Sequence, residues 1–144
     1  MKRTTVYLTS LLAVFLSAAA LGIGAAVDTP PTLMSRGDYS KGKKAIEAET
    51  RVAFARCRDQ SGIARDVCKA EVRAEERVKM ADLQARYHGT VNAAEDARLA
   101  RAKAQFDVAR ARCGSQNGEA RIDCLRSARE DRARALEQAK LAST

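Results

Sequence analysis

The phrase ARCRDQSGIARDVC occupies residues 55–68, and a second version, ARCGSQNGEARIDC, occupies residues 111–124. Aligning residues 52–73 with residues 108–129 gives eleven identities in 22 positions, among them both cysteines and the glycine between them. A duplication of this kind indicates two copies of one supersecondary unit. Each phrase has a glycine next to a serine or an asparagine, between helix-forming flanks. Each copy therefore predicts a helical hairpin that bends between its two cysteines.

The rest of the chain has a helical composition. Ala, Glu, Lys, Leu and Arg make up 62 of the 118 residues that follow residue 26, and no proline follows Pro31. We predict helices at about 36–59, 63–86, 92–113 and 119–141. The predicted fold class is all-α, with two disulfide-stapled antiparallel helical hairpins in an elongated four-helix arrangement, packed as one bundle or stacked end to end. The predicted segments are a signal peptide (1–26), a linker (27–34), hairpin repeat 1 (35–88) and hairpin repeat 2 (89–144).

The apolar residues of the middle helices recur at intervals of three and four, which is typical of a coiled-coil seam. In the second helix they are Ile63, Val67, Ala70, Ala74, Val78, Ala81 and Ala85, and in the third they are Leu99, Ala102, Phe106, Ala109 and Cys113. The seam is rich in alanine, so it buries little area. Phe54 and Phe106 are expected in the core. Ser35-x-x-Asp38 and Asn92-x-x-Glu95 are candidate capping boxes for the first and third helices.

The first 26 residues have the layout of a secretory signal peptide. Lys2 and Arg3 form a short basic start, and residues 6–23 are mostly apolar and uncharged. Small residues at 18–20 and at 24–26 offer two cleavage sites, of which the second is the expected one. The alternative is an uncleaved anchor, because this apolar run is barely long enough to span a bilayer. Cleavage removes two of the 26 basic residues and none of the 18 acidic ones, which leaves a net charge of +6. Charges of both signs are interspersed, as on a solvated helix face, although the positive balance also attracts anionic partners.

Four cysteines allow three pairings, and the repeat favours one of them. The two cysteines of each phrase flank a bend, so we expect the disulfides Cys57–Cys68 and Cys113–Cys124. Such bonds persist in oxidising compartments, and each contributes about 3 kcal/mol in the loop-entropy description. A zinc site is the functional alternative, but zinc ligands commonly lie about two to four residues apart or include histidines at fixed spacing. We predict structural disulfides and no metal site.

Few residues of the chain fit a catalytic constellation. His88 is the single histidine and lies in a predicted connection between helices. The chain has no glycine-rich phosphate loop after a strand and no Cys-x-x-Cys redox motif. Its carboxylates lie near basic residues at helical spacing, as in the i,i+4 pairs Glu75–Lys79 and Glu130–Arg134. We expect no enzymatic activity, no cofactor and no small-molecule substrate.

The first phrase follows the order Cys-x-x-x-Ser-Gly-x-Ala-basic-Asp-x-Cys, matched at Cys57, Ser61, Gly62, Ala64, Arg65, Asp66 and Cys68. In this order the chain resembles small exported proteobacterial proteins, rich in Ala and Lys, that repeat the phrase and are often labelled cell-envelope biogenesis or TolA-like proteins. The second copy departs from it at Asn117 and Ile122, which replace the serine and the aspartate. The resemblance covers about residues 35–140 and implies an exported helical protein without a settled activity.

These patterns lead us to expect a non-enzymatic helical protein of the periplasm with a structural or protein-interaction role in the cell envelope. One alternative is a small periplasmic chaperone or stress protein that holds clients on a cationic helical surface. Another is a binder of nucleic acid or of a different polyanion. The expected partner is an envelope protein or an anionic envelope polymer. Self-association stays open, and nucleic acid is the least favoured partner.

Overall fold

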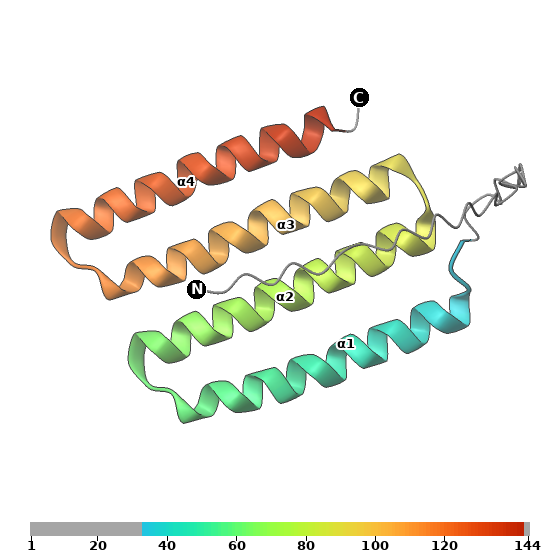
Figure 1. The fold of residues 1–144 in the computed structure, drawn as a ribbon, viewed down its shortest axis with the longest axis horizontal. Coiled ribbons are helices and arrows are strands. Elements are labelled where there is room, and N and C mark those ends of the chain that lie inside the picture. The colour runs from blue at the N-terminus through green and yellow to red at the C-terminus, as the bar shows by residue number, and fades with distance from the viewer. Residues whose placement is uncertain (1–32, 143–144) are drawn as a thin grey trace, which may run out of the picture. The chain divides into compact units, whose positions relative to one another are not determined.

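The structure, a computed structural model, describes residues 33–142, and every regular element in this range is helical (Figure 1). Its elements are α1 (Arg36–Arg56), η1 (Cys57–Asp59), α2 (Gly62–His88), α3 (Val91–Arg112), η2 (Cys113–Ser115) and α4 (Gly118–Leu141), where η marks a 3₁₀ turn. The predicted all-α class with two antiparallel hairpins is confirmed. None of these helices has an apolar stretch that could cross a membrane. The predicted signal peptide, and the linker apart from its last two residues, lie outside the described residues.

The helix ends lie within three residues of the predicted ends. Two of the differences have a visible structural cause. The first helix ends before its predicted limit because Cys57 starts a 3₁₀ turn. α2 continues to His88 and stops at Gly89, whose φ of 63° lies in the left-handed region that glycine adopts at little cost.

Of the two predicted capping boxes, the first has its N-cap and the second is misplaced. The Ser35 Oγ atom accepts a hydrogen bond from the Asp38 backbone N–H at 3.0 Å. At α3 the N-cap is Thr90, whose Oγ1 atom accepts a hydrogen bond from the Ala93 backbone N–H at 3.2 Å. Thr90 has an extended backbone, whereas Asn92 already lies inside the helix and cannot cap it.

The helices pack in chain order, α1 on α2, α2 on α3 and α3 on α4. Figure 1 shows them side by side, with α1 and α4 at the two edges. Each hairpin is one antiparallel pair, and the two hairpins meet along α2 and α3 rather than end to end. In consequence α2 and α3 each have two covered faces, whereas α1 and α4 have one.

Helix α2 carries two apolar stripes because it packs against a helix on each side. The predicted seam faces α3, where the Ile63 side chain reaches Gly114 of η2. Its other members are half-buried, and Ile63 is 41% exposed. A second stripe, with the buried residues Val72 and Leu83, faces α1 and was missed. The sequence prediction gave each helix one apolar stripe, whereas a helix that packs between two neighbours needs two.

The buried set is small and rich in alanine. It consists of Ile46, Cys57, Val72, Leu83, Ala97, Ala102, Ala104, Cys113, Ala128 and Ala139. The prediction that Phe54 and Phe106 are core residues is wrong, because both are half-buried. Helices that approach through alanines leave little room for a phenyl ring between them. The rings lie at the margins under guanidinium groups, with Arg73 5.9 Å from the Phe54 centroid and Arg132 4.9 Å from the Phe106 centroid.

Gly42 permits the close approach of α1 and α2. A Cβ atom at this position would lie 2.8 Å from Leu83 Cδ1, and Leu83 is only 2% exposed. Glycine inside a helix costs stability, and this contact accounts for its presence here. About one turn before Gly42 on α1 and one turn after Leu83 on α2, Tyr39 stacks on Tyr87 with the ring centroids 4.5 Å apart.

Candidate functional site

The predicted disulfides close both bends. Cys57 is bonded to Cys68 and Cys113 to Cys124, with the Cα atoms 5.7 Å apart in each pair. None of the cysteines in residues 33–142 is free. The same range contains no group of His, Cys, Asp and Glu side chains arranged to hold a metal ion. All four predicted site residues therefore form the expected disulfide bonds.

The two bends have the same backbone geometry. In each, a 3₁₀ turn leads to two extended residues, Gln60 and Ser61 or Gln116 and Asn117, and then to a glycine at the start of the next helix. Gly62 has a φ of 53° and Gly118 a φ of 57°, values that residues with a Cβ atom adopt only with strain. This explains why the glycine is shared by both phrases.

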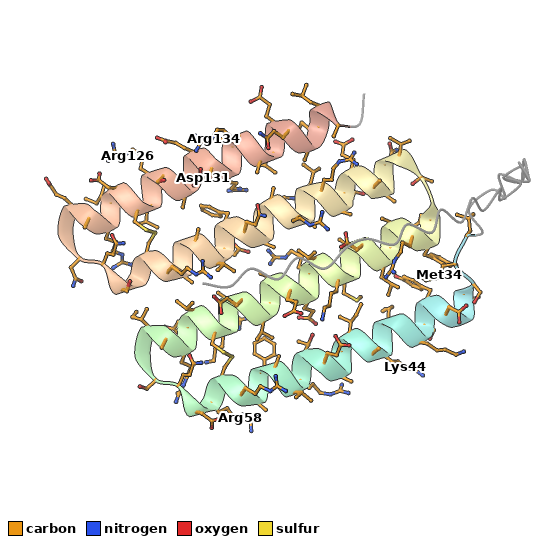
Figure 2. The ribbon with its side chains drawn as sticks, in the orientation of Figure 1. Met34, Lys44, Arg58, Arg126, Asp131 and Arg134 are labelled. Carbon is orange, nitrogen blue, oxygen red and sulfur yellow. A yellow bond between two sulfur atoms is a disulfide. The ribbon has the colours of Figure 1, made fainter. Side chains whose placement is uncertain are left out.

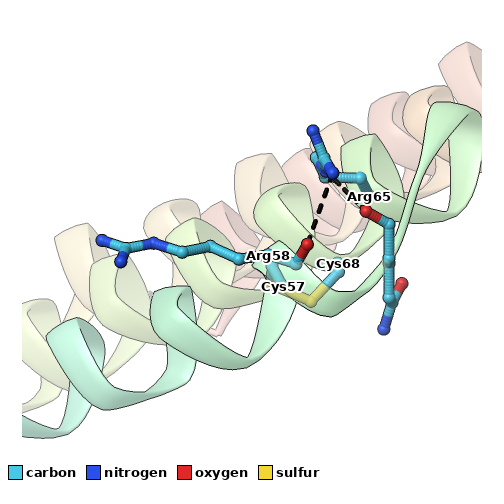
Figure 3. Close-up of a disulfide and its surroundings, with 5 residues drawn as sticks. Cys57, Arg58, Arg65 and Cys68 are labelled. Atoms are coloured by element: carbon cyan, nitrogen blue, oxygen red, sulfur yellow. Dashed lines mark hydrogen bonds between the residues drawn. A yellow bond between two sulfur atoms is a disulfide. The ribbon is translucent and has the colours of Figure 1, made fainter.

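Arg65 reinforces only the first bend. Its Nε atom donates a hydrogen bond to the Gln60 carbonyl oxygen at 2.6 Å, and its Nη2 atom donates one to the Arg58 carbonyl oxygen at 3.3 Å (Figure 3). The matching Arg121 makes no such bond within the described part of the chain. The arginine that both phrases share therefore stabilises the bend by these hydrogen bonds in the first copy only.

Ion pairs set the register between the two hairpins. Three pairs join the middle of α2 to the second half of α3: Glu71–Arg112 at 2.7 Å, Arg77–Asp107 at 2.5 Å and Asp82–Arg101 at 2.9 Å. Exposed pairs of this kind each contribute at most about 1 kcal/mol. Their main effect is to favour one antiparallel alignment, because a slip of one turn would separate all three.

Lys79 links the helices of the first hairpin. Its Nζ atom lies 2.7 Å from Glu49 of α1 and 2.8 Å from Glu75 of its own helix, so the predicted Glu75–Lys79 pair is confirmed. The hydrogen bond with Glu49, followed by the one with Glu75, raises the pKa of Lys79 above its ordinary value. The amine stays protonated at neutral pH and is therefore a poor base or nucleophile.

A surface hollow crosses α1, α2 and α3. Its lining includes the buried residues Ile46 and Ala97 and the charged residues Glu49, Lys79, Asp82 and Arg101. These four charged side chains are engaged in the ion pairs above. His88 lies apart from this hollow as the last residue of α2, where it is exposed. The remaining charged residues of the hollow's lining are Arg86 and Arg98.

Each of the two edge helices has one long face that no other described helix covers. We call Lys41, Lys44, Ala45, Ala48, Arg51, Val52 and Ala55 the α1 outer face, and Glu119, Asp123, Arg126, Glu130, Ala133, Arg134 and Glu137 the α4 outer face. All of these residues are exposed, and Figure 2 shows Lys44 and Arg126 at opposite edges. The α1 outer face holds three cations and no carboxylate, whereas the α4 outer face holds four carboxylates and two arginines.

Arginines on α4 pair within their own helix. Arg126 pairs with Asp123, and Arg134 pairs with Asp131. The predicted Glu130–Arg134 pair is therefore wrong, because the aspartate three positions before Arg134 takes its guanidinium group. Glu130 is left without an ion-pair partner among the described residues.

The candidate site is thus a set of helix faces rather than an enclosed cavity. Sequence reasoning located the four cysteines, but it missed that the two edges differ in charge. The sequence matches no family model, no curated protein and no solved structure.

Proposed function

We propose that this chain is exported to the periplasm and acts there without catalysis, by binding another envelope protein through its helix faces. The signal-peptide pattern supports export, as do the two disulfides, which are typical of proteins in oxidising compartments. The observation that carries the binding role is the α1 outer face. All seven of its residues are exposed, and its largest apolar side chain, Val52, is 55% exposed.

The α1 outer face suits a helical partner better than a small molecule. From Lys41 to Ala55 it extends about 21 Å, at about 1.5 Å per residue. Alanines and Val52 form a narrow apolar strip, with Lys44 and Arg51 on one side of it. Sites for small molecules are concave and enclose most of their ligand. A helix with small apolar residues and neighbouring carboxylates would match both the strip and its charges.

A second candidate function, binding of an anionic envelope polymer, has one observation in its favour. The α1 outer face holds Lys41, Lys44 and Arg51 without a carboxylate among them. Lys41 pairs with Asp38 at the start of the same helix, at 3.7 Å, which leaves Lys44 and Arg51 as the cations of this face that are unpaired among the described residues. Binding of this kind releases counterions, so its affinity falls steeply as salt rises. A protein partner that also uses the apolar strip would show a weaker salt dependence.

Cross-linking in intact cells tests the proposed function. A photoreactive residue placed at Ala48 or at Ala133 reports on the two outer faces, and one at the exposed Gln84 of α2 is the matched control. We expect an adduct with a different envelope protein from at least one outer face and not from Gln84. Equal labelling at all three positions, or no protein adduct from either face, would contradict the proposal. Polymer binding without a protein adduct would favour the second candidate.

A further inference from the structure

We propose that copies of this chain associate head to tail, with the α4 outer face of one copy packed on the α1 outer face of the next. This inference rests on the proposed role of the outer faces in binding proteins, and it names a second copy as the partner. The junction would continue the packing that already joins the two hairpins within one chain.

The sequence repeat relates the four helices in pairs. A shift of 56 residues places α1 on α3 and α2 on α4. The α2–α3 junction is therefore a contact between the second helix of one hairpin and the first helix of the next. Among the described residues, α4 is a second helix that is not followed by another hairpin, and α1 is a first helix that is not preceded by one. Another copy supplies the missing neighbour of both.

The α1 outer face keeps part of the surface by which α3 contacts α2. Ala48, Val52 and Ala55 of α1 correspond to residues of the same type in α3, namely Ala104, Val108 and Ala111. Ala104 is 2% exposed, and the other two are half-buried. The same small side chains on α1 are exposed, so a neighbouring helix could approach α1 as closely as α2 approaches α3.

The α4 outer face carries charges where α2 carries its seam. The shift places Val67, Ala74 and Ala81 on Asp123, Glu130 and Glu137. Residues seven apart lie almost in line along a helix, so these three carboxylates form one row. Lys44, Arg51 and Arg58 are also seven apart and form a row along α1 and into η1, with Lys44 and Arg58 at the α1 edge in Figure 2. The two rows have opposite charge and equal length, about 21 Å.

The alignment of the existing junction brings these rows opposite each other. In the existing junction, Arg77 of α2 lies opposite Asp107 of α3. The equivalent positions are Ala133 on α4 of one copy and Arg51 on α1 of the next, so Ala133 would lie opposite Arg51. Glu130 lies one turn from Ala133. The Asp82–Arg101 pair corresponds in the same way to Gln138 opposite Ala45.

At both positions a carboxylate of α4 comes near a cation of α1. Glu137 precedes Gln138, and Lys44 precedes Ala45, so Glu137 and Lys44 come within reach of each other. Neither Lys44 nor Arg51 has an ion-pair partner in the described part of the chain, and the same holds for Glu130 and Glu137. The third pair between the two rows would be Arg58 with Asp123. Asp123 already forms an ion pair with Arg126 of its own helix.

Such a junction is heterologous, because it joins two different faces, and it therefore produces open rows or closed rings rather than a twofold dimer. Exposed ion pairs are individually weak and are screened by salt. We expect reversible association that increases with protein concentration and is lost at high ionic strength.

Sedimentation velocity of the exported chain, purified with both disulfides intact, tests this inference. At about 20 mM salt, where screening is weak, the average sedimentation coefficient should rise with protein concentration, and at about 500 mM salt the rise should disappear. Lys44→Glu with Arg51→Glu makes both outer faces acidic, and Glu130→Lys with Glu137→Lys makes both basic. Each double variant alone should sediment as a monomer. An equal mixture of the two should associate again, because their faces are complementary.

A control variant separates the effect of the faces from that of net charge. Asp66→Lys with Asp96→Lys changes the net charge by the same amount as the basic variant, but it leaves both outer faces unchanged. It should associate like the unmodified chain. A monomeric unmodified chain at low salt, association of either double variant alone, or a mixture that stays monomeric would overturn the inference. Cross-links to an envelope protein would still support the proposed function in that case.

Discussion

Replacement of Gly42 by alanine tests the close packing of α1 on α2. A Cβ atom there would lie 2.8 Å from Leu83 Cδ1 and 3.1 Å from Cδ2, so the buried Leu83 side chain would have to move. Overpacking of this kind costs about 1–3 kcal/mol, whereas exchanging glycine for alanine inside a helix gains about 1 kcal/mol. The steric cost is the larger of the two effects. We therefore expect the free energy of unfolding to fall by about 1 kcal/mol.

Urea unfolding followed by circular dichroism measures this change, and two further variants test the cause. At Gly37 a Cβ atom would meet only Ser35 Oγ, at 3.7 Å, so Gly37→Ala should cause no loss. In a Leu83→Ala background the obstruction is absent, and Gly42→Ala should then stabilise the protein by about 1 kcal/mol. The reasoning is refuted if Gly42→Ala has the same effect on stability in both backgrounds.

Three further changes probe the bends and the ion pairs. Cys113→Ser with Cys124→Ser should lower the free energy of unfolding by about 3 kcal/mol in urea titrations, and a loss well under 1 kcal/mol would show that the bend is rigid without its disulfide. Lys79→Met should cost less than about 1 kcal/mol at neutral pH, because the side chain is partly exposed. Since the folded pKa of Lys79 is raised above 10.5, its contribution is fully present below that pH and is lost as the pH rises further. The difference between Lys79→Met and the unmodified chain should accordingly stay constant up to about pH 10 and shrink beyond it; a difference that grows above this pH would contradict the assigned cause. A double-mutant cycle on Glu71→Ala and Arg112→Ala should give a coupling of about 0.2–1 kcal/mol, and no coupling would remove this pair from the junction.

The sequence was enough to predict what depends on local signals. The bends could be located because each requires a glycine with positive φ, and the pairing of Cys57 with Cys68 follows from their positions on either side of one bend. The four helices follow from composition and from the breaks at Gly62, Gly89 and Gly118. These features are set within about a dozen residues of chain, where turn chemistry and helix propensity decide the outcome.

Packing between distant segments could not be predicted in the same way. Leu83 was missed as a buried residue because its contact, Gly42, lies about forty positions away and reads only as a helix breaker. The rings of Phe54 and Phe106 were expected in the core, since their size suggests burial, but alanines set the distance between the helices. The difference between the outer faces was present in the repeat, where Val67 and Ala74 correspond to Asp123 and Glu130. This difference can be interpreted only once the structure shows that another helix covers this face of α2, whereas no described helix covers the matching face of α4.

The claim on which the rest depends is that each cysteine is bonded within its own repeat. Tryptic digestion without reduction, followed by mass spectrometry, tests it directly, because trypsin cleaves between the two cysteines of each bend. We predict that residues 57–58 will be recovered linked to residues 66–69, and residues 113–121 linked to residues 122–126. Recovery of residues 57–58 linked to either peptide of the second repeat, or of free thiols in the native protein, would contradict the account.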